Sequence, residues 1–331
     1  MPELPPPRIP TLDEIRAAGR RIAGTAVRTP LVRLEGTAEP EVWLKLESLQ
    51  PINAFKIRGA AAAITALPEA ERARGVWTIS AGNAGQGVAY AARQAGVPAT
   101  VLVIETAPET KLRRMRELGA RLVPAPFDAC WQAMDDRAFP GIEGVFIHPF
   151  DDHEFIAGNA TAGLEILEDL PDVRVVAAAV GGGGLTSGLG AAVKALTRGR
   201  EPPIRVVGVE PETAAPAALS YRRGEPLAFP EWQATFVDGA GGKSLFPRMW
   251  ERMRQVVDET VVVTLDEVRD AMRVLAERAR IIAEGAGALP VAAALTGKLG
   301  AEGPVVAVVS GGNIDLKKFA ELVGAVEQPT P

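Results

Sequence analysis

The sequence predicts an open α/β fold with a mainly parallel sheet. Short runs of β-branched residues alternate with stretches of helical periodicity along most of the 331 residues. Several of these runs are apolar on both faces, as strands buried inside a parallel sheet are. Such alternation is typical of α/β folds with right-handed crossovers, whose ligands bind beyond the carboxyl ends of the strands.

Eight runs are predicted as strands because each is short and rich in β-branched or other apolar residues. In chain order they are Val42–Leu46, Val76–Ser80, Thr100–Ile104, Val145–Ile147, Val175–Val180, Ile204–Val209, Val261–Thr264 and Val305–Val309.

Helical periodicity fills the gaps between these strands. The clearest stretches are 60–67, Gly87–Gln94, Thr110–Leu118, Leu164–Leu170 and Leu189–Leu196. Two helix starts carry a capping box, in which a threonine is followed three residues later by a glutamate. These pairs are Thr11 with Glu14 and Thr264 with Glu267.

Composition and charge exclude several classes of function. Hydrophobic residues make up 47% of the chain and charged residues 23%, which is ordinary for a soluble globular protein. The net charge of -5 argues against a nucleic-acid partner, because phosphate binding needs a basic surface. No apolar run approaches the roughly 20 residues of a membrane span, so no membrane partner is expected either.

Cysteine and histidine are scarce. Cys130 is the only cysteine, which excludes an internal disulfide and a thiolate metal cluster and predicts a cytoplasmic protein. His148 and His153 are the only histidines, and they lie outside any metal-ligand spacing. We therefore expect structural roles for both, no metal centre, and a chemistry that does not use a histidine base.

One lysine lies in unusually apolar surroundings. Lys56 follows Phe55 and precedes an alanine-rich stretch that is typical of a buried helix. Desolvation disfavours the ammonium form, and a neutral amine can form a Schiff base with an aldehyde. A lone lysine after an aromatic residue usually has a structural role. Other motifs in the chain are therefore needed to support a catalytic role for Lys56.

Three predicted strands end in similar loops of small residues, namely Ser80-Ala81-Gly82-Asn83, Gly181-Gly182-Gly183-Gly184-Leu185 and Ser310-Gly311-Gly312-Asn313. Asn83 supplies both a donor and an acceptor, and successive N–H groups at a helix N-terminus form an anion cradle. The tetraglycine loop lacks the third glycine of a dinucleotide fingerprint, so an isolated phosphate cradle fits better. A phosphate-bearing aldehyde joined to a lysine indicates pyridoxal phosphate.

With these motifs in place, the sequence resembles a fold-type II pyridoxal-phosphate enzyme of the serine/threonine dehydratase and serine racemase family, over nearly the whole chain. The resemblance implies two open parallel-sheet domains, as in the tryptophan synthase β subunit, with the cofactor between them. The large domain would comprise residues 1–75 and 154–331, and the small mobile domain residues 76–153. A homodimer is also implied. Supporting matches are Leu46-Glu47-Ser48-Leu49-Gln50, His148-Pro149-Phe150-Asp151-Asp152, Gly163-Leu164-Glu165-Ile166 and Asp238-Gly239-Ala240.

The resemblance also implies a role for each motif. Lys56 would carry the cofactor as a Schiff base and then remove the substrate Cα proton, with Phe55 packed beside it. Asn83 would bond the phenolic oxygen of the cofactor. The phosphate would be held by Gly181, Gly182, Gly183, Gly184 and Leu185. The pyridine nitrogen would face Ser310, and Glu284 would be an acidic residue near the site. The substrate carboxylate would bind to Ser80 and its loop.

The implied reaction is α,β-elimination of a β-hydroxy or β-substituted amino acid to a 2-oxo acid and ammonia. Ala54 stands where the family usually has serine, and Ala84 where it usually has histidine. The stretch 128–134 lacks the arginine that serine racemases use on substrate. These departures predict a roomier, less polar pocket, and a substrate other than serine or threonine.

Three alternatives to elimination come from the same resemblance. Racemases of the family have a serine where this chain has Ala81, and alanine cannot move a proton, so elimination is favoured. A β-replacement synthase and a cofactor-binding relative without activity both stay open.

A cation bound near Glu210 and the carbonyl of Ala214 also stays open, although Pro216 stands where a further carboxylate is usual.

Overall fold

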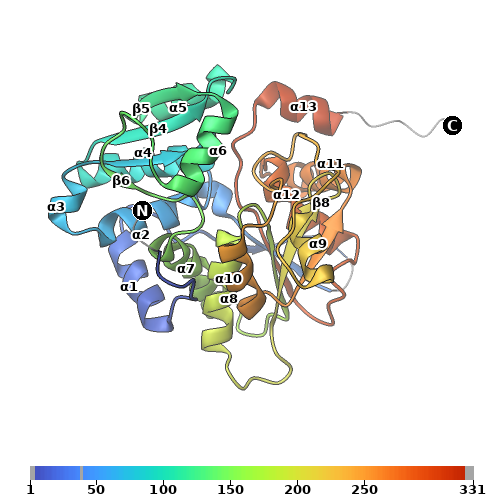
Figure 1. Ribbon diagram of the computed structural model, residues 1–331. Helices are drawn as coiled ribbons and strands as arrows, with labels where there is room; N and C mark the ends of the chain where they lie inside the picture. Colours follow the sequence, from blue (N-terminus) through green and yellow to red (C-terminus); the bar gives the residue numbers. More distant parts are fainter. Residues whose placement is uncertain (1–3, 38–39, 325–331) are drawn as a thin grey trace.

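The protein is built around two mainly parallel sheets, which the computed structural model describes within residues 4–37 and 40–324 (Figure 1). The larger sheet has six strands in the order β1-β2-β10-β7-β8-β9. These strands are β1 Leu31–Arg33, β2 Val42–Lys45, β7 Val175–Ala179, β8 Arg205–Pro211, β9 Glu259–Val263 and β10 Val305–Val308. The smaller sheet has the order β5-β4-β3-β6, with β3 Val76–Ile79, β4 Ala99–Ile104, β5 Arg121–Ala125 and β6 Val145–Phe146.

All eight predicted strands are confirmed, with ends that differ by up to two residues. β1 and β5 were not predicted. β1 has three residues and pairs antiparallel with β2, which leaves the larger sheet mainly parallel, as expected. β5 contains Pro124, which weakens a strand prediction, but β5 lies at the edge of its sheet, where a missing N–H is tolerated.

The helices alternate with the strands as predicted. Both capping boxes are present. In each, the threonine side chain accepts the backbone N–H group of the glutamate, and the glutamate side chain accepts the backbone N–H group of the threonine. The helices are α1 Leu12–Ile22, α2 Lys56–Ala66, α3 Glu69–Arg72, α4 Asn83–Ala95, α5 Glu109–Glu117, α6 Phe127–Asp136, α7 His153–Asp169, α8 Gly184–Leu196, α9 Pro216–Arg223, α10 Pro247–Val256, α11 Leu265–Val274, α12 Gly285–Leu295 and α13 Leu316–Gly324. A 3-10 turn, η1, spans Glu47–Leu49, and a π-helical turn, η2, spans Leu275–Ala279.

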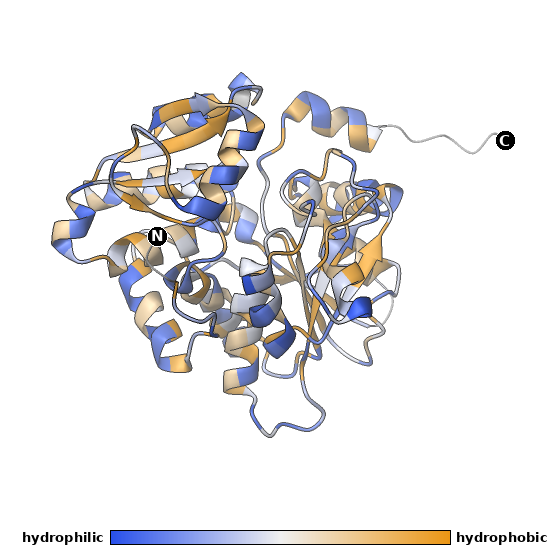
Figure 2. Cartoon of the chain, in the orientation of Figure 1, coloured by the Kyte–Doolittle hydropathy of each residue, from blue (hydrophilic) through white to orange (hydrophobic). Residues whose placement is uncertain are grey.

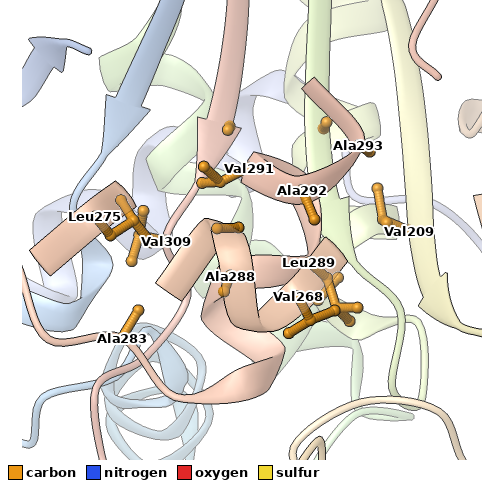
Figure 3. Packing of buried hydrophobic residues seen from close by; sticks show 14 of the residues in the cluster. Val209, Val268, Leu275, Ala283, Ala288, Leu289, Val291, Ala292, Ala293 and Val309 are labelled. Atoms are coloured by element: carbon orange, nitrogen blue, oxygen red, sulfur yellow. The ribbon is translucent and has the colours of Figure 1, made fainter. Parts of the chain in front are cut away.

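The larger sheet is covered on both faces at its centre, which explains why β7 and β10 are apolar throughout. Along β7, Val175 and Ala177 face the cluster built around α11 and α12, whereas Val176 and Ala178 face α8 and α10. Figure 3 shows α12 packed into the first of these clusters, with Leu289 beside Val268. Burial on both faces fixes the sheet between two helical layers.

The smaller sheet is sandwiched in the same way. Val76 packs toward α4 and α2, and the next residue, Trp77, packs toward α6. Helix α4 also packs directly on α2, because a Cβ atom on Gly87 would lie 3.1 Å from the carbonyl oxygen of Lys56. Figure 2 shows the strands mainly in hydrophobic colours, and the outer helices with alternating hydrophilic turns. The ends of β3, β7 and β10 are thereby brought toward α2.

Within residues 4–37 and 40–324, every helix is too short or too polar to cross a bilayer.

Candidate active site

Lys56 is the first residue of α2, and its amine lies in an apolar niche. Its Nζ atom donates a hydrogen bond of 2.6 Å to the carbonyl oxygen of Pro149. The same atom lies 5.1 Å from the ring centroid of Phe55 and 5.4 Å from that of Phe155. Burial lowers the pKa of Lys56 to about 8. A substantial fraction of this amine is therefore neutral near physiological pH.

The turn around His148 presents groups to both Lys56 and the glycine loop. The Nδ1 atom of His148 accepts hydrogen bonds from the backbone N–H groups of Phe150 (3.3 Å) and Asp151 (2.9 Å). Burial, with the charge of Arg137, lowers the pKa of His148 to about 3, so the ring stays neutral and can accept. His148 therefore has a structural role in holding the Pro149 carbonyl against Lys56.

The tetraglycine loop joins β7 to α8 and forms an open backbone cradle. Gly183 has φ +82°, a left-handed conformation that favours glycine, and no side chain caps the helix. A Cβ atom on Gly182 would lie 2.2 Å from the ring of Phe150, so the loop leaves no room for a side chain there. Among the described residues, the backbone N–H groups from Gly181 to Thr186 have no protein acceptor. This arrangement suits a phosphate group.

A second uncapped helix start lies where β3 ends. The hydroxyl oxygen of Ser80 accepts the N–H group of Gly82 at 3.0 Å, which closes the loop. In the described part of the chain, the N–H groups of Asn83, Ala84 and Gly85 at the start of α4 have no acceptor. The Ser80 hydrogen is also available to donate. These groups suit a carboxylate, and the role that the resemblance implies for this loop stays a prediction.

Asn83 bridges the loop after β3 to the loop before α12. Its Nδ2 atom donates to the Glu284 carboxylate at 2.7 Å, and its Oδ1 atom accepts from Asn313 Nδ2 at 2.7 Å. Burial, together with the charge of Asp238, raises the pKa of Glu284 to about 7. Asn313 was predicted to lie in a glycine-rich loop but without a role. The available signal was an amide side chain at the end of that loop, from which it reaches across to Asn83.

The loop after β10 is tied to the segment that carries Lys56. The Ser310 carbonyl accepts the N–H group of Phe55 at 2.9 Å, and Ala54 forms an antiparallel bridge with Gly311. Asn53 has φ 56°, a left-handed conformation that asparagine tolerates better than most residues. Within residues 4–37 and 40–324, no protein group bonds the Ser310 hydroxyl, which leaves it free for a ligand.

A buried ion network lies directly beneath the start of α2. Arg58 donates two hydrogen bonds of 2.8 Å to Glu47, and further bonds of 2.7 Å and 2.8 Å to Glu165. Lys45, which is fully buried in β2, donates to Glu165 at 2.5 Å. The sequence reading found Glu47 and Glu165 only as matching motifs. A charged residue inside an apolar strand, as at Lys45, was the available signal.

Glu210 lies at the end of β8, away from the groups described above. Its two carboxylate oxygens accept the N–H groups of Ala217 (3.0 Å) and Ala218 (2.7 Å) at the start of α9. Burial raises the pKa of Glu210 to about 8. The described residues contain no group of three or more side chains arranged to hold a metal ion. Here the carboxyl group of Glu210 caps a helix that begins at Pro216.

The structure brings most of the predicted site residues together. The Lys56 amine bonds the carbonyl of Pro149, and the ring of the next residue, Phe150, packs against Gly182. Gly181 approaches Gly239, which in turn lies beside Glu284. The Lys56 amine, six unpaired backbone N–H groups and an unpaired serine hydroxyl, all within the described part of the chain, fit the aldehyde, phosphate and ring nitrogen of pyridoxal phosphate. Ser80 joins this set through the loop that it shares with Asn83.

Comparison with known proteins supports the same assignment. The chain matches the family described as "Pyridoxal-phosphate dependent enzyme" over residues 22–311. It is 42% identical over 319 residues to an L-threonine ammonia-lyase of Thermotoga maritima, covering 95% of this chain and 78% of the relative. It is 36% identical over 323 residues to the catabolic L-threonine dehydratase of Escherichia coli strain K12, covering 96% and 97%.

Solved structures agree with this picture. Maize serine racemase superposes with a TM-score of 0.85 at 30% identity, covering 95% of this chain and 97% of that one. The serine racemase of Dictyostelium discoideum gives a TM-score of 0.80 at 32% identity, covering 92% and 99%. The expected fold, with two mainly parallel sheets, and the expected cofactor are thereby confirmed. This chain belongs to the family of pyridoxal-phosphate-dependent enzymes.

Proposed function

We propose that this protein is an ammonia-lyase that converts a β-hydroxy or β-substituted amino acid to a 2-oxo acid and ammonia by α,β-elimination. The observation that carries the proposal is the position of the Lys56 amine. It bonds the Pro149 carbonyl next to Phe150, which contacts the cradle before α8, and the Lys56 backbone contacts Gly87 on α4. Both of these helices have uncapped starts. One suits the phosphate of the cofactor and the other the carboxylate of an amino acid. The names of the relatives support the same reaction class.

When bound, pyridoxal phosphate supplies an electron sink for the substrate Cα carbon. The residues of the chain position and deprotonate the substrate around it. Lys56, with its pKa lowered to about 8, is the base that removes the Cα proton. Ser310 offers a hydroxyl rather than a carboxylate to the ring nitrogen, so it provides no full negative charge there. Asn83 is held in place by Glu284 and Asn313, and its second amide hydrogen would be available to the phenolic oxygen of the bound cofactor.

Elimination is preferred over racemisation because of Ala81. Racemisation needs a second proton donor on the face of the substrate opposite to Lys56. Alanine at position 81 cannot act as that donor. Turnover of L-serine to D-serine at a rate comparable with 2-oxo acid formation would favour the racemase instead.

We also propose that residues 76–153 act as a small domain that closes over the substrate. This range supplies the whole smaller sheet, and the ion pair between Lys111 on α5 and Asp238 reaches across to the rest of the chain. Closure of such a unit would exclude water from the reacting atoms.

The single cysteine supports a cytoplasmic location. The resemblance supports a homodimer, which light scattering on the purified protein would check.

The function is tested with purified protein supplied with pyridoxal phosphate. We expect 2-oxo acid and ammonia in equal amounts from at least one β-hydroxy amino acid. Lys56→Ala should abolish both this activity and the visible absorbance band of the lysine-bound cofactor. Lys317→Ala, on the exposed face of α13, is the matched control and should retain both. Cofactor loading without any 2-oxo acid from a broad substrate panel would contradict the proposal.

A further inference from the structure

A cavity of about 160 Å³ lies directly beside the loop that would hold the substrate carboxylate. Ser80 and Ala81 form its wall on the side of the site. The remaining wall comes from β3, β4 and α6, and includes Leu102, Cys130 and Trp131. The cavity therefore extends from the substrate loop into the apolar interior between the smaller sheet and α6.

The lining of this cavity is apolar. Leu102 and Cys130 belong to the buried cluster beneath α6, and none of the lining residues, all of which the structure describes, carries a charge. Cys130 is buried, and burial with the nearby charge of Glu105 raises the pKa of its thiol, which keeps it neutral. Apart from the thiol and the Trp131 indole, the polar side-chain group of the lining is the Ser80 hydroxyl, which already accepts from Gly82. A polar or charged group entering this cavity would lose water without adequate compensation.

A row of aromatic rings begins at the wall of the cavity that α6 forms. Trp131 stacks on Phe246 with ring centroids 5.8 Å apart, and it meets Phe127 edge-on at 6.0 Å. Phe246 in turn contacts Phe150 at 5.2 Å, and Phe150 backs the tetraglycine cradle. The row thus runs from the cavity to the phosphate cradle.

We propose that this cavity receives the β-substituent of the substrate, and that the preferred substrates are β-hydroxy amino acids with a phenyl-sized apolar group on Cβ. The inference rests on the proposed function and narrows it. Only two bonds separate the carboxylate carbon of an amino acid from Cβ, so a carboxylate held at the Ser80 loop places the β-substituent at the cavity wall. A dry cavity of about 150 Å³ accommodates benzene, which matches the volume found here.

The reaction on such a substrate is balanced without any further reactant. The Cα–H and Cβ–O bonds break, the Cα–Cβ double bond forms, and the hydroxyl leaves with a proton as water. One water molecule then hydrolyses the released enamine, after its shift to the imine, to the 2-oxo acid and ammonia. For threo-3-phenylserine the products are phenylpyruvate and ammonia. The methyl group of threonine would leave most of the cavity empty.

The test compares kcat/KM of the holoenzyme for L-threo-3-phenylserine, L-threonine and L-serine. Because one methylene group in an apolar pocket changes kcat/KM by roughly 10- to 200-fold, we expect phenylserine to exceed threonine at least tenfold. In Cys130→Leu, which fills part of the cavity, the ratio of the two values should fall at least tenfold. Val103→Leu, on the opposite face of β4, is the matched control and should leave the ratio unchanged.

A binding measurement decides the case without any variant or turnover. L-phenylalanine and L-2-aminobutyrate lack the leaving hydroxyl, and their binding to the wild-type holoenzyme is followed from the cofactor absorbance. We expect L-phenylalanine to bind at least tenfold more tightly. Equal binding, or highest kcat/KM on threonine or serine, would overturn the pocket assignment while leaving the lyase proposal intact. If no β-hydroxy amino acid is turned over but L-phenylalanine binds preferentially, the pocket stands and the lyase proposal fails.

Discussion

Replacing Arg58 by methionine tests the buried ion network that supports the start of α2. Arg58 is 2% exposed, and its guanidinium group bonds two carboxylates, those of Glu47 and Glu165. Methionine fills a similar volume without charge. The change therefore leaves two carboxylates, the fully buried Glu47 and the largely buried Glu165, facing the single remaining cation of this network, Lys45. Because Lys56 lies two residues before Arg58, cofactor binding should weaken as well.

The expected loss of stability is about 3–5 kcal/mol, the usual cost of removing one partner from a buried ion pair. Its pH dependence follows from Glu47. Burial alone would raise the pKa of Glu47, but the charge and hydrogen bonds of Arg58 hold it below 4.5. The wild-type protein therefore gains stability from Glu47 above pH 4.5 and loses it as the pH falls through the lowered pKa. Without Arg58, the pKa of Glu47 should rise above 4.5, so the variant is destabilised most at neutral pH.

The assay is urea unfolding of the cofactor-free proteins near pH 5 and near pH 8. The difference in free energy of unfolding between wild type and Arg58→Met should be larger at the higher pH. Arg113→Met is the matched control, because the Arg113 side chain is 69% exposed and lies 3.9 Å from Glu117. Such an exposed pair contributes at most about 1 kcal/mol. A loss below about 1 kcal/mol in Arg58→Met, or a loss independent of pH, would refute the reasoning.

Three further predictions concern the site. When cofactor is added to apoprotein, the visible absorbance of bound cofactor should appear at a rate that rises about tenfold per pH unit below the Lys56 pKa of about 8 and levels off above it. An inflection near the ordinary lysine pKa of 10.5 would contradict the argument that burial lowers this pKa. Gly182→Ala forces a Cβ atom to within 2.2 Å of the Phe150 ring, an overpacking of about 1–3 kcal/mol. Cofactor titration should therefore show at least about tenfold weaker binding, whereas Gly19→Ala, whose Cβ atom would lie 3.6 Å from its nearest neighbour, should bind normally. Finally, the pKa of Glu284 is raised from 4.5 to about 7, so its contribution to stability is fully present below pH 4.5 and is lost as the pH rises through 7; unfolding measured across this range should show that decline in the wild type and not in Glu284→Gln.

Local features of the chain could be predicted without the structure. Strands buried on both faces, such as β7 and β10, are continuous apolar runs, because both neighbouring helical layers exclude water. Capping boxes depend on residues three positions apart, so Thr11 and Thr264 indicate their helices directly. Glycine-rich turns after strands marked the cradle, because only small residues leave backbone N–H groups accessible.

Two of the edge strands, β1 and β5, were not predicted from the sequence, whereas the edge strands β6 and β9 were. β1 and β5 lie at the edges of their sheets, where half of the backbone groups have no strand partner and the sequence requirements are weak. Pro124 is acceptable in β5 only because of that position. The sequence of such a strand gives little signal, since its stability comes from the neighbouring strand.

By itself, the sequence determined the α/β fold class, the catalytic lysine candidate and the anion cradle, because each depends on residues close together in the chain. The tertiary structure decided which distant residues meet. It placed the Pro149 carbonyl against Lys56 and Glu284 against Asn83. The lowered pKa of Lys56 and the apolar cavity beside Ser80 likewise arise only when separate helices and strands pack around them. Burial is a property of the assembled layers, and no short stretch of sequence contains it.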